Sequence, residues 1–279
     1  MEGGPAVSVM MPTFNSGDFL LEAVESAVSQ MRPDDELLIE DGASTDGSIE
    51  RIVTTYGSAT QVKVVSQPDK GQADALNKAL ARAVNPVVGW LNGDDCYYPG
   101  ALDAARRGWL EDPTVDLVYG GWTLYSETGE ILRYCVPNQL TRAGLMRTPQ
   151  IFTGSMFMRA STVREVGGFD PGFHYCMDMD LVARILRRGL VPTLVPETLG
   201  GFRWYGGSKT GALEFGVVRE SLKVRRRYAT GVAGQIEAYI FSGTQAVSQA
   251  AIPLRRSKLY SRLRLRSAKA RRAATAAES

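Results

Sequence analysis

The first half of the chain alternates short apolar runs with segments of helical periodicity. The apolar runs are typical of strands covered on both faces, and they fall at 7–11, 36–40, 62–66, 87–92 and 115–121. Between them, apolar residues recur at helical spacing over roughly 18–30, 48–56 and 72–84, and from Pro99, which suits the first turn of a helix. Strands that alternate with helices predict an α/β fold with a mostly parallel, Rossmann-like central sheet flanked by helices.

The pattern changes in the second half of the chain. The stretch 122–135 predicts a β-hairpin that turns at "ETGE", so we expect an antiparallel addition to the parallel half. A helix is predicted over 178–188, with Gly189 placed to end it, and 211–250 also has a helical pattern. We therefore expect four regions, namely 1–210 with halves 1–121 and 122–210, a helical segment 211–253, and a basic C-terminal tail at 254–279, either helical or disordered.

Composition narrows the class of protein. With 279 residues, 44% of them hydrophobic, the chain can bury a sizeable core in one large domain with an appendage. Its cysteines, Cys96, Cys135 and Cys176, are too widely spaced for a zinc site or a disulfide framework and fit a reducing compartment. The N-terminus does not resemble a secretory leader, and no apolar stretch approaches the ~20 residues of a membrane span. We expect a cytoplasmic protein.

Positive charge is concentrated in the basic tail. Residues 254–279 hold nine Lys or Arg and one acid, so the tail carries +8 and the preceding residues carry −6, within a total of +2. Three interpretations remain open: a solvated end, an anchor to an anionic membrane surface at the inner membrane face, or a nucleic-acid contact.

Polar clusters follow the first four predicted strands. They read "PTFN" (12–15), "DGASTDGS" (41–48), "QPDKGQADALN" (67–77) and "NGDD" (92–95). Because ligands of open α/β sheets bind at the carboxyl ends of the strands, four such clusters at one edge indicate a shared ligand. An isolated "DD" is usually only a solvated turn, and Asp46 has a second interpretation as a turn or helix-cap residue.

The chemistry of this edge indicates what the ligand is. The chain has neither a G-x-G-x-x-G after the first strand nor a P-loop. Its carboxylates outnumber its cations, which include Lys70, so a bound phosphate needs a bridging metal. Adjacent carboxylates are hard oxygen ligands suited to Mg²⁺ or Mn²⁺. A nucleoside diphosphate held through such a metal therefore fits this edge best.

Taken together, six motifs resemble those of the inverting family-2 glycosyltransferases, which have the GT-A fold. They are "VSVMMPTFN", "LIEDGASTDGS", "QPDKGQADALNKAL", "WLNGDD", "VGGFD" and "MDMDLVARI", in family order over residues 6–210. The resemblance implies a GT-A catalytic domain, a nucleotide-sugar donor that we expect to be UDP-linked, and Mn²⁺ or Mg²⁺. It also implies hexosyl or N-acetylhexosaminyl transfer to a hydroxyl of a glycan, a lipid-linked saccharide or another acceptor.

The resemblance also assigns roles to residues. Asp178 matches the catalytic base, and Asp95 matches the metal ligand of a D-x-D-like element. The implied nucleotide-sugar contacts are Pro12, Thr13, Asn15, Asp41 (to uracil), Asp69, Lys70, Gln72, Asn77, Asp94 (to ribose or sugar hydroxyls) and Arg203. The implied acceptor-side residues are Gly168, Phe169, Asp180 and Trp204, although Asp180 also suits the first turn of a helix.

One position departs from the family pattern. Tyr205 stands where many relatives have a histidine that contacts the metal or the diphosphate, so Arg203 and Lys209 are candidates to share the neutralising role. Two alternatives to a saccharide-directed enzyme stay open. One is a nucleic-acid-modifying glycosyltransferase anchored by the basic tail, and the other is a non-catalytic nucleotide-sugar-binding or scaffold protein.

Overall fold

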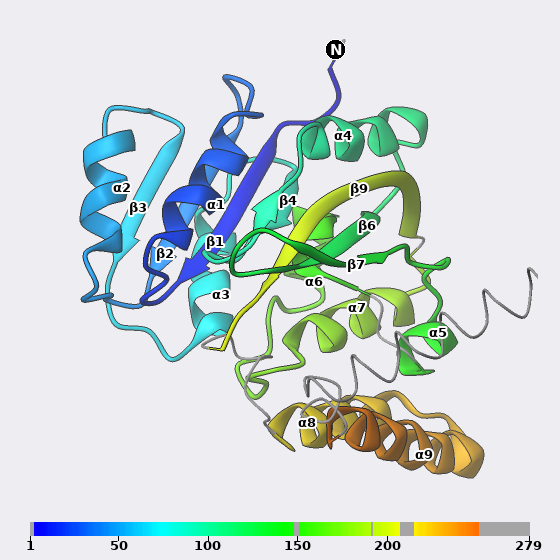
Figure 1. The fold of residues 1–279 in the computed structure, drawn as a ribbon. Coiled ribbons are helices and arrows are strands. Elements are labelled where there is room, and N and C mark those ends of the chain that lie inside the picture. The colour runs from blue at the N-terminus through cyan, green and yellow to red at the C-terminus, as the bar shows by residue number, and fades with distance from the viewer. Residues whose placement is uncertain (1–2, 148–150, 191, 207–214, 251–279) are drawn as a thin grey trace, which may run out of the picture.

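A computed structural model describes residues 3–147, 151–190, 192–206 and 215–250 (Figure 1). Across these residues, nine strands form one sheet: β1 (Val7–Thr13), β2 (Glu36–Asp41), β3 (Val62–Ser66), β4 (Val87–Trp90), β5 (Cys96–Tyr97), β6 (Leu117–Ser126), β7 (Ile131–Cys135), β8 (Met156–Arg159) and β9 (Pro192–Trp204). Their order is β3-β2-β1-β4-β8-β6-β9-β5, and β7 pairs with β6.

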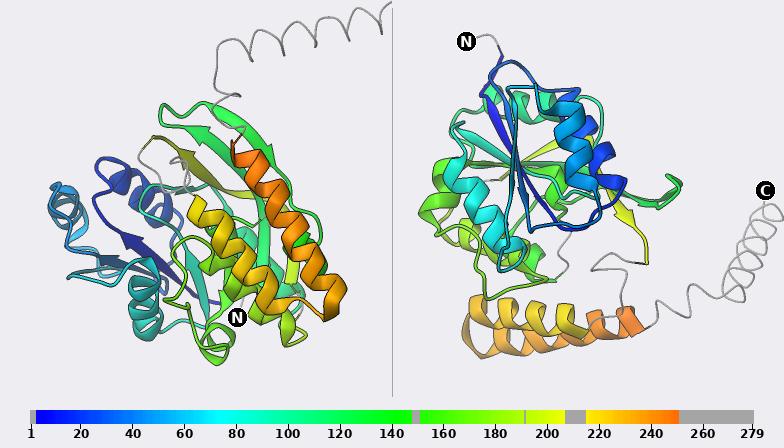
Figure 2. Two further views of the ribbon diagram at one scale, coloured as in Figure 1. Left: turned by 90° about the horizontal axis from the view of Figure 1, so that it is seen from below. Right: turned by 90° about the vertical axis from the view of Figure 1, so that its left-hand side faces the viewer.

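Helices cover both faces of this sheet (Figures 1 and 2). They are α1 (Phe19–Val28), α2 (Ser48–Tyr56), α3 (Gln72–Arg82), α4 (Ala101–Glu111), α5 (Arg142–Arg147), α6 (Ala160–Glu165), α7 (Met177–Arg187), α8 (Phe215–Tyr228) and α9 (Gly231–Ala250), with a short 3₁₀ turn at Thr153–Ser155. Gly189 follows α7 with a positive φ of 77°, which confirms it as the residue that ends this helix. Among the described helices, none is long and apolar enough to cross a membrane.

The parallel half of the sheet agrees with the sequence prediction. Strand β1 pairs in parallel with β2 and β4, and β2 pairs in parallel with β3. Every residue of β1 is buried, because its two faces pack against different layers. Val7, Val9 and Met11 belong to the cluster that includes α1 and α4, whereas Met10 belongs to the cluster that includes α3 and α7. This two-sided burial explains why the strand reads as a nearly continuous apolar run.

The second half of the sheet is mixed. The hairpin of β6 and β7 confirms the predicted antiparallel addition, and a hydrogen bond from the Ser126 N–H to the Glu130 carbonyl (2.8 Å) closes its turn. Strand β8 lies between β4 and β6 and is antiparallel to both, so the fourth and fifth predicted strands are not neighbours. Strand β9, which the sequence pattern did not predict, runs parallel to β6.

Helices α8 and α9 form a hairpin on one side of the sheet domain (Figure 2). The predicted helical stretch 211–250 is therefore two helices, which separate at Ala229 and Thr230. The predicted boundary at residue 210, Lys209 and the basic tail lie outside the described residues.

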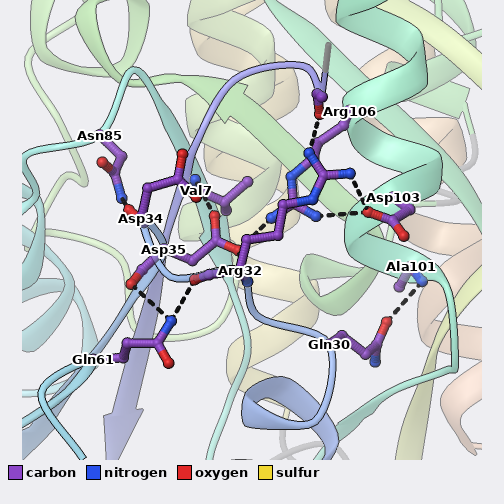
Figure 3. Close-up of polar contacts among 11 residues, drawn as sticks. Val7, Gln30, Arg32, Asp34, Asp35, Gln61, Asn85, Ala101, Asp103 and Arg106 are labelled. Atoms are coloured by element: carbon purple, nitrogen blue, oxygen red, sulfur yellow. Dashed lines mark hydrogen bonds and ion pairs between the residues drawn. The ribbon is translucent and has the colours of Figure 1, made fainter. Parts of the chain in front are cut away.

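A buried ion pair fixes the amino end of the parallel strands (Figure 3). The guanidinium of Arg106 in α4 donates to the carboxylate of Asp35, and both side chains are buried. The same carboxylate accepts the backbone N–H groups of Val7 (2.8 Å) and Arg32 (2.7 Å), while Arg106 also donates to Asp103 (2.8 Å). These contacts join α4 to the starts of β1 and β2, so the charges here are neutralised within the fold.

Candidate functional site

A pocket of about 710 Å³ opens at the carboxyl ends of the parallel strands. It is lined by residues that follow β1, β3 and β4 and by residues of α3, α7, α8 and α9. Of the residues that the sequence predicted, it brings together Pro12, Thr13, Asp69, Gln72, Asp94 and Asp178. The other predicted residues, Asn15, Asp41, Lys70, Asn77, Asp95, Gly168, Phe169, Asp180, Arg203 and Trp204, are not among the residues that line it.

Asn92 connects the end of β4 to its neighbours. Its side-chain oxygen accepts hydrogen bonds from Gln72 Nε2 and from the Trp90 indole N–H, both at 2.7 Å. Its Nδ2 group donates to Asp95 Oδ2 at 2.9 Å. The sequence pattern did not indicate a role for Asn92, because its contacts reach back along the chain to α3 as well as forward to the acid pair.

A close approach of two loops shapes the floor of the pocket. Gly93 is buried beside the loop after β1, and a Cβ atom at this position would lie 2.7 Å from Thr13 Oγ1 and 3.0 Å from Ser16 Oγ. Those two hydroxyls hydrogen-bond each other at 2.8 Å. A glycine is therefore required between the two loops, and it leaves the next residue, Asp94, at the pocket wall.

The two adjacent acids have different environments. Asp95 is 1% exposed, and its carboxylate accepts the Asn92 amide on one oxygen and the Arg203 backbone N–H (3.0 Å) on the other. Burial, together with the charge of Asp94, raises the pKa of Asp95 well above its usual range. Asp94 is partly exposed and lines the pocket. The predicted division between a metal-binding Asp95 and a sugar-binding Asp94 stays a prediction, and the geometry favours Asp94 for a metal.

Arg203 contacts both members of the acid pair, Asp94 and Asp95, from the protein interior. It is 4% exposed, and its Nε donates to the Asp94 carbonyl at 3.0 Å. Its guanidinium also pairs with Glu22 and lies 4.3 Å from the ring centre of Phe19 and 4.8 Å from that of Tyr125. The Arg203 guanidinium, which we expected to neutralise a diphosphate, is therefore already engaged by contacts within the protein.

Tyr205 reaches the pocket from the end of β9. Its hydroxyl donates to Asp94 Oδ2 at 3.1 Å, and its ring packs edge-on against Phe19 with the centroids 5.0 Å apart. Burial and the charge of Asp94 raise the pKa of the Tyr205 hydroxyl, so it stays a neutral donor. The residue that departs from the family pattern therefore contacts the acid at the pocket wall.

Asp178 lies in the first turn of α7 and lines the same pocket. Its Oδ1 accepts the Met179 backbone N–H at 2.7 Å. Burial raises the pKa of Asp178 to about 6, because the loss of hydration outweighs the hydrogen bonds that it accepts. No Lys or Arg of the described chain forms an ion pair with it. An unpaired carboxylate with a pKa near neutrality is suited to accept a proton.

Glu220 of α8 holds the segment that leads into Asp178. Its buried carboxylate accepts three consecutive backbone N–H groups, from His174 (2.9 and 3.0 Å), Tyr175 (2.7 Å) and Cys176 (3.0 Å). Its negative charge also contributes to the raised pKa of Asp178. Sequence reasoning missed this residue, because its partners lie more than 40 positions away.

The loops after β1 and β2 are tied to each other. The backbone N–H of Asn15 donates to Ser44 Oγ (2.8 Å), and its side-chain oxygen accepts the Thr45 N–H (2.9 Å). The buried Asp41 carboxylate accepts the Ser44 N–H (2.9 Å) and the hydroxyls of Ser44 and Ser66. The Asp41 carboxylate thus already accepts hydrogen bonds from Ser44 and Ser66, and its predicted contact with uracil stays a prediction.

The predicted acceptor-side residues have packing contacts. Asn77 pairs with the backbone of Phe169 in both directions, donating at 2.8 Å and accepting at 2.9 Å. Gly168 has a φ of +68°, and a Cβ there would lie 2.5 Å from the Asn77 side-chain oxygen. Asp180 is fully buried and accepts from Arg184 (2.8 Å), and from Arg227 (2.8 Å) and Tyr228 (3.1 Å) of α8. Their acceptor roles stay predictions.

Aromatic side chains line another part of the pocket. Trp122, Phe152 and Phe202 contact one another, with ring centroids 5.5 to 6.4 Å apart. Trp90 is buried, and its ring packs on Phe169. Trp122 thus belongs to an aromatic cluster at the pocket, whereas Trp204, the predicted acceptor-side residue, is not among the residues that line it.

A metal site here would need ligands from outside the protein. Within the described part of the chain, no group of three or more His, Cys, Asp or Glu side chains could by itself hold a metal ion. Divalent cations that assist phosphate chemistry are commonly bound by one or two carboxylates together with phosphate oxygens and water. Asp94 fits that kind of site as the protein ligand.

The mixed, largely parallel sheet flanked by helices matches the GT-A fold of solved glycosyltransferase structures. The chain belongs to glycosyl transferase family 2, whose model matches residues 8–166. A model of glycosyl transferase family group 2 also matches residues 88–269.

Relatives and solved structures agree with this family. An uncharacterized glycosyltransferase of Rickettsia felis is 28% identical over 192 residues, which are 66% of this chain and 32% of that protein, so the match spans about a third of the relative. The mannosyltransferase PcManGT from Pyrobaculum calidifontis, solved with GDP-Man and Mn²⁺, has a TM-score of 0.63 at 20% identity, covering 95% of this chain and 80% of its own. TarS 1-349 from S. aureus, solved with UDP-GlcNAc, has a TM-score of 0.63 at 16% identity, covering 88% and 72%.

Proposed function

We propose that this protein is an inverting glycosyltransferase that moves a sugar from a UDP-linked donor to an acceptor hydroxyl. The observation that carries the proposal is that Asp94 and Asp178 line one pocket at the carboxyl ends of the strands. In this proposal Asp94 holds the cation of the donor diphosphate, and the raised pKa of Asp178 supports its role as the base. Solved structures of the same fold hold nucleotide sugars, namely GDP-Man in PcManGT and UDP-GlcNAc in TarS.

In the proposed reaction, Asp178 takes the proton of the acceptor hydroxyl. The hydroxyl oxygen forms a bond to the anomeric carbon as the bond from that carbon to the diphosphate breaks, which inverts the configuration. The bonding electrons leave with the nucleoside diphosphate, and the proton ends on the Asp178 carboxylate. With a pKa of about 6, this carboxylate is mostly ionised at neutral pH and still basic enough to accept the proton.

Asp94 is the residue proposed to hold a divalent cation, Mn²⁺ or Mg²⁺, together with the donor diphosphate. When bound, the cation supplies positive charge that offsets the charge of the leaving diphosphate. Tyr205 orients the Asp94 carboxylate through its hydroxyl, and Arg203 holds the backbone at the same residue. Asp95 acts from the interior by fixing Asn92 and Arg203 rather than by touching the donor.

The other pocket residues complete the proposal. On the proposed donor side, Thr13 ends β1, Asp69 follows β3 and Gln72 begins α3. The aromatic cluster of Trp122, Phe152 and Phe202 offers apolar ring faces on which a sugar can pack. In this proposal residues 1–210 form the catalytic domain, with donor binding in 1–121 and acceptor binding in 122–210.

A thermal-shift panel tests the proposal. The full chain is titrated with UDP-, GDP- and dTDP-sugars, each with and without Mn²⁺, because a ligand that binds the folded state raises the unfolding temperature. We expect a UDP-sugar with Mn²⁺ to give the largest increase, and the Asp178→Asn variant to keep it. A panel in which no nucleotide sugar raises the unfolding temperature would overturn the proposal, and a GDP-sugar preference would correct the donor.

A further inference from the structure

The outer face of α9 is apolar and uncovered. Val232, Ile236, Tyr239, Ile240 and Val247 are 53 to 78% exposed, and their spacing places them along one side of the helix. The opposite side packs inward through the buried residues Ala238 and Ser242. We name these five exposed residues the α9 stripe. Exposed apolar side chains at regular helical spacing indicate a surface that is covered by something else.

A row of cations borders the α9 stripe. Arg219, Lys223 and Arg226 are exposed on α8 at positions i, i+4 and i+7, which we name the α8 row. The guanidinium carbon of Arg226 lies 5.6 Å from the ring centre of Tyr239, so the α8 row meets the α9 stripe at this contact. Figures 1 and 2 show the two helices side by side as one layer on the outside of the domain.

We propose that the α9 stripe and the α8 row dock on the surface of an anionic lipid membrane. A helix with apolar side chains on one face and cations beside them lies in the plane of a lipid surface, with the apolar face among the acyl chains. Each Lys or Arg near such a surface contributes about 1 kcal/mol of attraction. The basic tail, with nine Lys or Arg, begins four residues after α9 ends, so further positive charge follows the same surface along the chain.

Charge argues against a second copy of the chain as the occupant. A symmetric contact through the α9 stripe would bring the α8 rows of two copies toward each other, and six cations would then repel. A lipid surface supplies the opposite charge to Arg219 and Arg226, while the Lys223 ammonium also donates to the Gly172 carbonyl at 3.1 Å. An anionic membrane is therefore complementary to both the apolar α9 stripe and the basic α8 row.

The same helix pair also borders the pocket. Val217 and Ser221 of α8 and Gln245 of α9 line it from their inner side. Docking would thus hold the pocket about one helix diameter, roughly 10 Å, from the lipid surface. Resting on the proposed function, this placement suits an acceptor hydroxyl carried by a lipid-anchored molecule.

Vesicle co-sedimentation of the full chain tests the docking surface. The vesicles contain phosphatidylcholine alone or phosphatidylcholine with phosphatidylglycerol, and no nucleotide sugar is present, so the result is independent of transfer. We expect binding to the anionic vesicles and weak binding to the neutral ones. The Ile236→Asp variant should lose at least ten-fold in partition, while Val84→Asp, at an exposed apolar residue outside this surface, should bind as wild type.

A second pair of variants tests the charges. Arg219→Gln and Arg226→Gln should each reduce binding to anionic vesicles about five-fold, as expected for about 1 kcal/mol per cation. Arg187→Gln, at the end of α7, makes the same charge change outside the α8 row and should have no comparable effect. Unfolding temperatures equal to that of wild type would show that each variant is folded.

Two outcomes would overturn the docking proposal. Unchanged vesicle binding by Ile236→Asp would mean that another segment, including the basic tail, makes the contact. A wild-type dimer in light scattering that Ile236→Asp converts to a monomer would identify a second copy as the occupant. Nucleotide-sugar binding in the thermal-shift panel would stand in either case, so failure of docking and failure of the proposed function are distinguishable.

Discussion

Carboxylates lie at both ends of the same parallel strands, but their partners differ. At the amino end, the buried Asp35 faces the guanidinium of Arg106 and two backbone N–H groups (Figure 3). At the carboxyl end, Asp178 accepts backbone N–H donation, has no ion-pair partner among the described residues, and lies beside the negative charge of Glu220. Burial of a charge therefore does not by itself indicate function here. The candidate for chemistry is the carboxylate whose charge is left uncompensated.

The largest expected effect is at Asp178. Its replacement by asparagine keeps the size and polarity of the side chain but removes the base, so kcat should fall by about 10³-fold. The unfolding temperature should not decrease, because no ion pair is lost. Transfer assays with the donor found in the thermal-shift panel measure the first effect, and calorimetry measures the second. Undiminished transfer would remove Asp178 from its proposed role.

Asp35→Asn should show the opposite behaviour. Removing one partner of a buried ion pair leaves Arg106 short of its counter-charge, which typically lowers the free energy of unfolding by about 3 kcal/mol. The rate per folded molecule should stay near that of wild type. Chemical denaturation followed by a transfer assay at a temperature where both proteins are folded makes the comparison. An Asp35→Asn variant that is stable but inactive would contradict the distinction between a structural carboxylate at the amino end of the strands and a functional one at the carboxyl end.

The roles of the adjacent acids Asp94 and Asp95 can be distinguished by the same kind of comparison. Asp94→Asn should weaken Mn²⁺-dependent UDP binding by about 10²-fold, because the cation loses its protein carboxylate. Asp95→Asn is the matched control, and we expect it to change stability more than metal dependence, since its carboxylate is buried and bonded to Asn92 and Arg203. Titration calorimetry with and without Mn²⁺ measures both. If Asp95→Asn alone abolished the metal dependence, the sequence prediction would be right and our preference for Asp94 wrong.

The smallest of these effects is expected at Glu220. Glutamine can still accept backbone N–H groups but lacks the negative charge that helps to raise the pKa of Asp178. Glu220→Gln should therefore move the acid limb of the kcat profile to lower pH, with a few-fold change in kcat at neutral pH. A purely structural role would lower stability and leave that limb in place.

Much of the structure of residues 1–121 could be predicted from the sequence, because its signals are local. Strands β1 to β4 are short apolar runs, each followed within a few residues by its polar cluster. Adjacent side chains were harder to separate, since the choice between Asp94 and Asp95 depends on contacts with Arg203, more than 100 positions away.

The structure of the residues after 121 depends on long-range contacts that no local sequence pattern indicates. Strand β8 inserts between β4 and β6, and β9 pairs with β6 across more than 70 residues. The sequence left two interpretations of Asp180, and its contacts with Arg227 and Tyr228 of α8 could not be predicted from any local pattern. The role of Glu220 could not be predicted from the sequence. A glutamate in a helix is usually solvent-exposed, and only the structure shows the backbone N–H groups that bind it.

The pH dependence of kcat tests the central claim most directly. Asp178 must be ionised to act as the base, so activity should rise ten-fold per pH unit below its pKa of about 6 and become level above it. The limb should persist in His174→Gln, which removes the histidine of that segment at the pocket, and should vanish from the residual activity of Asp178→Asn. A limb near pH 6 that survives in Asp178→Asn would contradict the assignment of the base, and with it the contrast between the two ends of the sheet.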